Sequence, residues 1–162
     1  MERAKPKFER LRTIYLNTLE AMKTNPQAYC RGLAPSPDVS AGETDQLKAR
    51  ADAALNNITF TLSYEEAARD CDLVIEAIAE NPEEKIAFYT ELAKHLPKKT
   101  IIATNSSTML PSAFAQYTGR PEKYLALHFA NEIWRNNTAE VMGHPETSKQ
   151  AYDDVAEFAE TI

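Results

Sequence analysis

The chain has 162 residues, of which 43% are hydrophobic, and a formal net charge of −6 at pH 7. This length predicts one domain with enough apolar residues for a core. The acidic balance and the scattered basic residues argue against a nucleic-acid partner, because nucleic-acid binding needs clustered Lys and Arg. Residues 1–20 are charged and no apolar run could span a bilayer, so we expect a cytoplasmic protein with no signal peptide and no membrane partner.

The first third of the chain has the pattern of helices. Apolar residues recur at helical spacing over residues 2–24, which predicts an amphipathic helix that ends before Pro26. A second helix is predicted over residues 43–55, after an irregular, proline-containing connection. We therefore expect residues 1–56 to be mainly helical, as one part of a single domain over residues 1–162.

The remainder, residues 57–162, alternates between strand-like and helix-like segments. Strands are predicted at residues 57–62, 73–79, 100–104, 124–129 and 139–142. Helices are predicted after Ser63, from Pro82 (with Asn81 as N-cap and Pro97 as the stop), around residues 111–117, and at the end of the chain with Ala151, Val155, Phe158 and Ile162 facing inward. The alternation predicts an α/β fold with a doubly wound, Rossmann-like parallel sheet and flanking helices, in which ligands bind beyond the carboxyl ends of the strands.

Polar side chains end two of these predicted strands. Asn105 and Ser107 follow the strand at 100–104, while His128 lies near the end of the strand at 124–129, with Glu140 twelve positions further on. An imidazole with an unperturbed pKa of about 6.5 can exchange a proton near neutrality, and a carboxylate can orient it. These groups could move a proton on and off an alcohol oxygen. Taken singly, however, these residues are more typical of a backbone-bonded histidine, a solvated glutamate and turn residues.

The order of four motifs resembles one family. From Asp70 the chain reads Asp-Cys-Asp-Leu-Val-Ile-Glu-Ala-Ile-Ala-Glu-Asn-Pro-Glu-Glu-Lys, followed by Ile-Ile-Ala-Thr-Asn-Ser-Ser-Thr, Leu-His-Phe-Ala-Asn and Ala-Glu-Val-Met-Gly. This resembles the cofactor-binding domain of the L-3-hydroxyacyl-CoA dehydrogenases, which include 3-hydroxybutyryl-CoA dehydrogenase. The resemblance implies an oxidoreductase of fatty acid metabolism that uses NAD as cofactor and oxidises an acyl-CoA substrate to its 3-oxo form.

The resemblance also implies roles for individual residues. His128 matches the catalytic histidine of the family, Glu140 the glutamate paired with it, and Ser107 the serine that contacts the 3-oxygen of the substrate and the nicotinamide. The matching cofactor contacts are Glu80, Lys85, Asn105 and Ser107, and the matching substrate contacts are Ser107 and Asn131. Without the resemblance, Glu80 and Lys85 would be interpreted as a strand-end carboxylate and a lysine in the first turn of a helix.

The chain departs from the family pattern in its glycines. Dehydrogenases of this kind hold the pyrophosphate on a glycine-rich turn, where the backbone must approach the ligand closely. The four glycines here, Gly32, Gly42, Gly119 and Gly143, do not form G-x-G-x-x-G. We therefore expect an incomplete sheet in a truncated cofactor domain that lacks this N-terminal unit and the C-terminal helical domain. Such a chain should be inactive alone and should bury its exposed sheet edge in a homo-oligomer.

Several alternatives remain open at this point. The family usually has Pro-Val after Asn131, whereas this chain has Glu132 and Ile133, so the acyl preference is undetermined. The same His–Glu pair would serve a related hydroxyacid or carnitine-type dehydrogenase, and a chain without the phosphate turn could be a non-catalytic remnant or binding module. The two cysteines and three histidines have no metal-ligand spacing, so no metal site is expected.

Overall fold

The computed structural model describes residues 5–162 and divides into two compact units. The first unit comprises Met1–Leu62 and Asn131–Asn137, and the second comprises Ser63–Ala130 and Thr138–Ile162. The boundary after Leu62 lies close to the predicted change from helices to alternating elements. The expectation that the whole chain is one domain stays a prediction.

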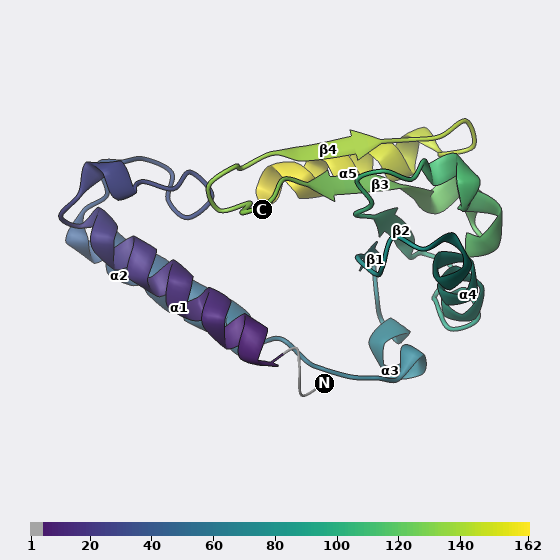
Figure 1. Cartoon of the computed structure of the whole chain (residues 1–162), viewed down its shortest axis with the longest axis horizontal. Helices are drawn as coiled ribbons and strands as arrows, with labels where there is room; N and C mark the ends of the chain where they lie inside the picture. The colour runs from purple at the N-terminus through teal and green to yellow at the C-terminus, as the bar shows by residue number, and fades with distance from the viewer. Residues whose placement is uncertain (1–4) are drawn as a thin grey trace. The chain divides into compact units, whose positions relative to one another are not determined.

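The first unit is built on a pair of helices. Helices α1 (Lys5–Met22) and α2 (Ala41–Asn56) lie side by side (Figure 1), and the short 3-10 helix η1 (Pro26–Ala28) follows α1. Ser40 and Glu43 form a capping box that starts α2. The buried core of this unit contains Leu19, Met22 and Ala34, with Leu47 packed against it. The predicted helix 2–24 is therefore found, ending at Met22, while its residues 2–4 lie outside the described part of the chain.

The strand predicted at residues 57–62 is wrong. These residues belong to no strand in the described part of the chain, although Phe60 packs edge-on against Phe8 of α1 with ring centroids 5.3 Å apart. The β-branched and aromatic residues Ile58, Thr59 and Phe60 favour a strand locally. A strand also needs a neighbour to which its backbone can hydrogen-bond, and none lies beside this segment in its own unit.

The second unit contains a four-stranded sheet of order β1-β2-β3-β4. Strands β1 (Leu73–Glu76), β2 (Ile101–Thr104) and β3 (Tyr124–Phe129) are parallel, whereas β4 (Ala139–Met142) is antiparallel to β3. The predicted α/β fold with a Rossmann-like sheet and flanking helices is therefore confirmed, and three of the four strands are parallel. The segment between β3 and β4 holds no crossover helix, and a direct return along the same edge gives an antiparallel pair. The first strand also ends at Glu76, three residues earlier than predicted.

Helices cover both faces of this sheet. The three α-helices are α3 (Tyr64–Ala68), α4 (Pro82–Leu92) and α5 (Lys149–Thr161), and the 3-10 helices are η2 (Pro111–Ala113), η3 (Ala115–Thr118) and η4 (Pro121–Lys123). Ser63, Asn81 and Ser148 cap the α-helices with their side-chain oxygens. The short helix predicted at 111–117 is thus two 3-10 turns. Ile162 was expected to face inward, but it follows the end of α5 and is 60% exposed.

The alternation of side chains along each strand creates two cores. One face of the sheet, with Ala103, Leu125 and Leu127, packs against Val155 and Phe158 of α5, which lies along β3 and β4 (Figure 1). The opposite face packs against α4 and the 3-10 helices. Its members are Ala68, Tyr89, Leu92, Leu96, Ile102, Phe114, Ala115 and Tyr124. His128 and Glu76 are in register with this second face, because side chains two residues apart on a strand point the same way.

Candidate active site

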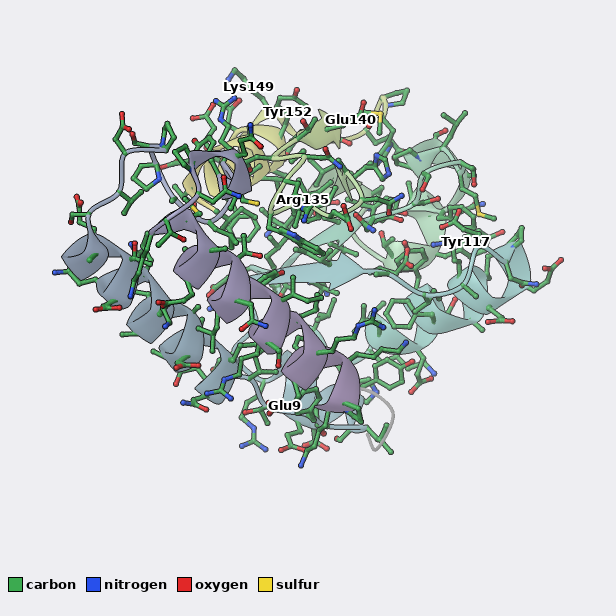
Figure 2. All side chains as sticks on the ribbon, turned by 60° about the vertical axis from the view of Figure 1, so that its left-hand side comes forward. Glu9, Tyr117, Arg135, Glu140, Lys149 and Tyr152 are labelled. Atoms are coloured by element: carbon green, nitrogen blue, oxygen red, sulfur yellow. The ribbon has the colours of Figure 1, made fainter. Side chains whose placement is uncertain are left out.

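The antiparallel pair β3/β4 brings a histidine and a glutamate together. His128 and Glu140 are direct register partners, and His128 Nδ1 lies 2.8 Å from Glu140 Oε2. The His128 side chain is 24% exposed, so its ring is reachable but partly shielded, and the Glu140 side chain is 60% exposed. Figure 2 shows Glu140 on β4 and Tyr152 on the neighbouring helix α5. An imidazole held by a carboxylate on one nitrogen leaves the other nitrogen available for proton exchange.

The segment after β2 is tied to the end of β3. Asn105 Oδ1 accepts a hydrogen bond of 2.9 Å from the backbone N–H of Phe129, the residue after His128. The backbone N–H of Asn105 in turn donates to the carbonyl of Glu76 at 2.8 Å. Ser106 is buried and Ser107 is exposed. Asn105 therefore acts as a bridge between β1, the β2 loop and the strand that carries His128.

Glu80 follows β1 and accepts hydrogen bonds from two hydroxyl groups. Its Oε2 lies 2.6 Å from Ser106 Oγ and 2.9 Å from Thr108 Oγ1, and its Oε1 lies 3.5 Å from Lys85 Nζ. The side chain remains 41% exposed. The hydrogen bond from Ser106 is the largest influence on the pKa of Glu80, which is lowered, so the group is a carboxylate at neutral pH. An exposed carboxylate at the end of a strand can accept hydrogen bonds from ligand hydroxyls.

Lys85 is buried rather than presented to solvent. Only 1% of its side chain is exposed, and its Nζ lies 2.8 Å from both carboxylate oxygens of Glu76. The sequence predicts Lys85 as a cofactor contact. In the structure its ammonium group is connected to the exposed carboxylate after β1 by the 3.5 Å contact with Glu80 Oε1. Helix α4 positions it there, since Asn81 caps the helix and Pro82 is its first residue.

Asn131 is the one predicted site residue that lies in the other compact unit. Its carbonyl accepts a hydrogen bond of 2.7 Å from Asn136 Nδ2 within the same segment. The other predicted residues belong to the second unit: at or beyond the carboxyl ends of the parallel strands, on helix α4, and near the amino end of the antiparallel strand β4. They are Glu80, Lys85, Asn105, Ser107, His128 and Glu140.

The sequence interpretation missed three residues of this cluster. Ser106 and Thr108, which were not among the predicted site residues, both donate hydrogen bonds to Glu80. Glu76 is not among the predicted site residues, yet it is the centre of a buried hydrogen-bond network. The one signal available was a carboxylate in an otherwise apolar run with a lysine nine residues later, since a buried charge requires a partner.

Among residues 5–162, no three His, Cys, Asp or Glu side chains gather in a way that could hold a metal ion. No helix in that range is long and apolar enough to cross a membrane. The carboxylate of Glu80 and the hydroxyl of Ser107 are both exposed and can form hydrogen bonds with a polar ligand. A glycine-rich pyrophosphate turn is absent from the sequence.

Comparison with known proteins identifies the family. Residues 18–162 match the family model described as 3-hydroxyacyl-CoA dehydrogenase, NAD binding domain. The chain is 36% identical over 109 residues to the fatty acid oxidation complex subunit alpha of Pseudomonas syringae, an alignment that covers 67% of this chain and 15% of that protein.

Solved structures of dehydrogenases and reductases are also similar to this chain. One is a diketoreductase, described by the words substrate-directed dual catalysis of dicarbonyl compounds. It is 42% identical to this chain with a TM-score of 0.78, and the match covers 98% of this chain and 48% of the diketoreductase. The (S)-3-hydroxybutyryl-CoA dehydrogenase of Ralstonia eutropha is 27% identical with a TM-score of 0.61, over 74% and 44%. The chain thus spans less than half the length of each of these relatives.

Proposed function

Because the chain belongs to the NAD-binding domain family of the 3-hydroxyacyl-CoA dehydrogenases, we propose that it carries the proton-transfer site of an enzyme that oxidises L-3-hydroxyacyl-CoA to 3-oxoacyl-CoA. The observation that supports this most is the 2.8 Å contact between His128 Nδ1 and Glu140 Oε2 at the end of β3. We further propose that the chain acts as the second portion of a cofactor domain within a longer enzyme.

In this proposal His128 is the general base. With Nδ1–H donating to Glu140, Nε2 is the nitrogen that takes the proton of the 3-hydroxyl group. Glu140 keeps the ring in this tautomer and stabilises the imidazolium that forms, as a carboxylate does for other catalytic histidines. Ser107, exposed on the loop after β2, would donate a hydrogen bond to the 3-oxygen.

Bound NAD would supply the hydride acceptor for the carbon that carries the 3-hydroxyl group. Glu80 would accept hydrogen bonds from ribose hydroxyls, and Ser107 and Asn105 would lie beside the nicotinamide. Lys85 would act through its contact with Glu80, since its own ammonium group is buried. Residues outside this chain would supply the glycine-rich pyrophosphate turn.

A second candidate function is the reduction of a dicarbonyl compound. It is favoured by the 42% identity to the diketoreductase, which extends over 98% of this chain. The chemistry is the reverse proton transfer at the same His–Glu pair, with His128 as the general acid.

A substrate comparison on the full-length enzyme tests both candidates. NADH absorbance is followed with an L-3-hydroxyacyl-CoA plus NAD, with its D isomer as control, and with a small diketone plus NADH. We expect kcat/KM for the L-hydroxyacyl-CoA to exceed the value for the diketone. A higher value for the diketone would select the second candidate, and turnover of neither substrate would reject both.

A further inference from the structure

The second unit contains a buried ionic network that the proposed proton transfer does not use. Glu76, at the end of β1, is 1% exposed, and its carboxylate accepts from four groups. These are Lys85 Nζ at 2.8 Å, Tyr89 Oη at 2.6 Å, Thr104 Oγ1 at 2.8 Å and the backbone N–H of Ile78 at 2.7 Å. Tyr124 extends the network by donating to the Tyr89 hydroxyl at 2.9 Å.

Apolar side chains could fill this part of the core at a lower cost in free energy. Removing two charges from water costs several kcal/mol per ion, and apolar residues of similar volume often replace a buried ion pair without loss of stability. A buried pair retained at such a cost is therefore a candidate for fixing one particular arrangement of the residues around it.

The network leads directly to the loop of the candidate active site. Lys85 lies between Glu76 and Glu80, with Nζ–O distances of 2.8 and 3.5 Å. On the other side, Thr104 donates to Glu76 while its Oγ1 accepts from the backbone N–H of Ser106 at 3.2 Å. Two separate routes thus connect one buried carboxylate to the two ends of the Glu80–Ser106 contact.

Ser106 connects this network to neighbouring residues through its hydroxyl group. Its hydroxyl donates to Glu80 and accepts from the backbone N–H of Met109 at 3.1 Å. The loop from 105 to 108, which carries Ser107, is consequently held at both ends by groups that depend on Glu76.

We propose that Glu76 is a positioning residue which, through Lys85 and Thr104, fixes Glu80 and the 105–108 loop in the arrangement that receives the cofactor. The role of these groups as cofactor contacts rests on the proposed function, whereas the fixing of the loop does not. Because Glu76 is buried, its proposed role is exerted through these residues rather than by direct contact with a ligand.

The test compares two variants of the 162-residue chain by amide hydrogen exchange. Glu76→Gln keeps the shape of the side chain but removes the charge that holds Lys85. Tyr89→Phe is the matched control, because it removes one hydrogen bond to Glu76 and leaves both routes to the loop in place. We expect exchange at the Ser106 and Met109 amides to accelerate about tenfold or more in Glu76→Gln and to change little in Tyr89→Phe, with circular dichroism showing that both are folded.

Unchanged exchange at these amides in a folded Glu76→Gln variant would overturn the proposal, as would equal acceleration in both variants. If Glu76→Gln does not fold, the variant Thr104→Val tests the proposal in its place. This variant keeps the Lys85–Glu76 pair and breaks the route to Ser106, so the Met109 amide, which donates to Ser106 Oγ and not to Thr104, must lose protection for the proposal to stand.

A second readout separates this proposal from the proposed function. In the full-length enzyme, Glu76→Gln should raise the Kd for NADH by about tenfold, and Tyr89→Phe should leave it unchanged within about twofold. Faster exchange in the loop with an unchanged NADH affinity would keep the positioning role and reject the 105–108 loop as a cofactor contact.

Discussion

His128 and Glu140 lie opposite one another across the antiparallel strands β3 and β4, and this register places His128 Nδ1 2.8 Å from Glu140 Oε2. The pairing depends on register because neighbouring residues of a strand point to opposite faces. A shift of one residue would move the carboxylate to the α5 side of the sheet. The segment between Phe129 and Ala139 sets this register and therefore determines whether His128 and Glu140 form a pair.

The first prediction concerns the contribution of Glu140. Glu140→Gln keeps a hydrogen-bond acceptor but removes the negative charge that stabilises the imidazolium, so kcat of the full-length enzyme should fall about 10- to 100-fold. Steady-state kinetics with the same acyl-CoA substrate measure the change. Glu157→Gln on the exposed surface of α5 is the control and should retain the kcat of the unmodified enzyme. Equal kcat values for the two variants would contradict a role for the pair.

Much of this arrangement follows from local patterns in the sequence. The bounds of β3 and β4 agree with the predicted strands, and Asn81 and Pro82 mark the start of α4, because alternation and capping are short-range signals. The direction of β4 and the missing strand at 57–62 depend on which segments become neighbours, and propensity does not determine that. The burial of Lys85 against Glu76 likewise depends on tertiary packing and not on local sequence pattern.

The second prediction is a change of stability with pH. Burial alone would raise the pKa of Glu76, but the hydrogen bonds from Lys85, Tyr89, Ile78 and Thr104 together lower it. The folded-state pKa lies below the unfolded value, so the contribution to stability is complete above the unfolded pKa and is lost as the pH falls through the folded one. Urea unfolding at pH 7 and pH 3 should show a smaller loss of stability for Glu76→Gln than for the unmodified chain. A loss as large in the variant as in the unmodified chain would contradict the assignment.

The third prediction is that the 162-residue chain binds NAD weakly by itself. The four glycines do not form the turn that presents backbone N–H groups to a pyrophosphate. Calorimetric titration of the chain with NAD should give a Kd well above the low micromolar range. Low micromolar binding would show that other residues of this chain hold the pyrophosphate.

The fourth prediction is self-association. Within the described residues, β1 pairs only with β2, so the opposite edge of this strand is unpaired, and Ile75 beside it is 39% exposed. Unpaired apolar edges favour addition of a strand from another chain. Sedimentation at micromolar concentration should therefore show a homo-oligomer that dissociates on dilution. A monomer with an ordinary melting transition at every concentration would reject this expectation.

The central claim is that His128 transfers the substrate proton, and the kcat of His128→Gln in the full-length enzyme tests it most directly. Loss of a general acid/base should lower kcat by about two to four orders of magnitude while the Kd for NADH changes little. His95→Gln, in the turn after α4, is the matched control and should keep the kcat of the unmodified enzyme, because its imidazole pairs with Glu91 of α4. A kcat of His128→Gln close to that of the control would contradict the account.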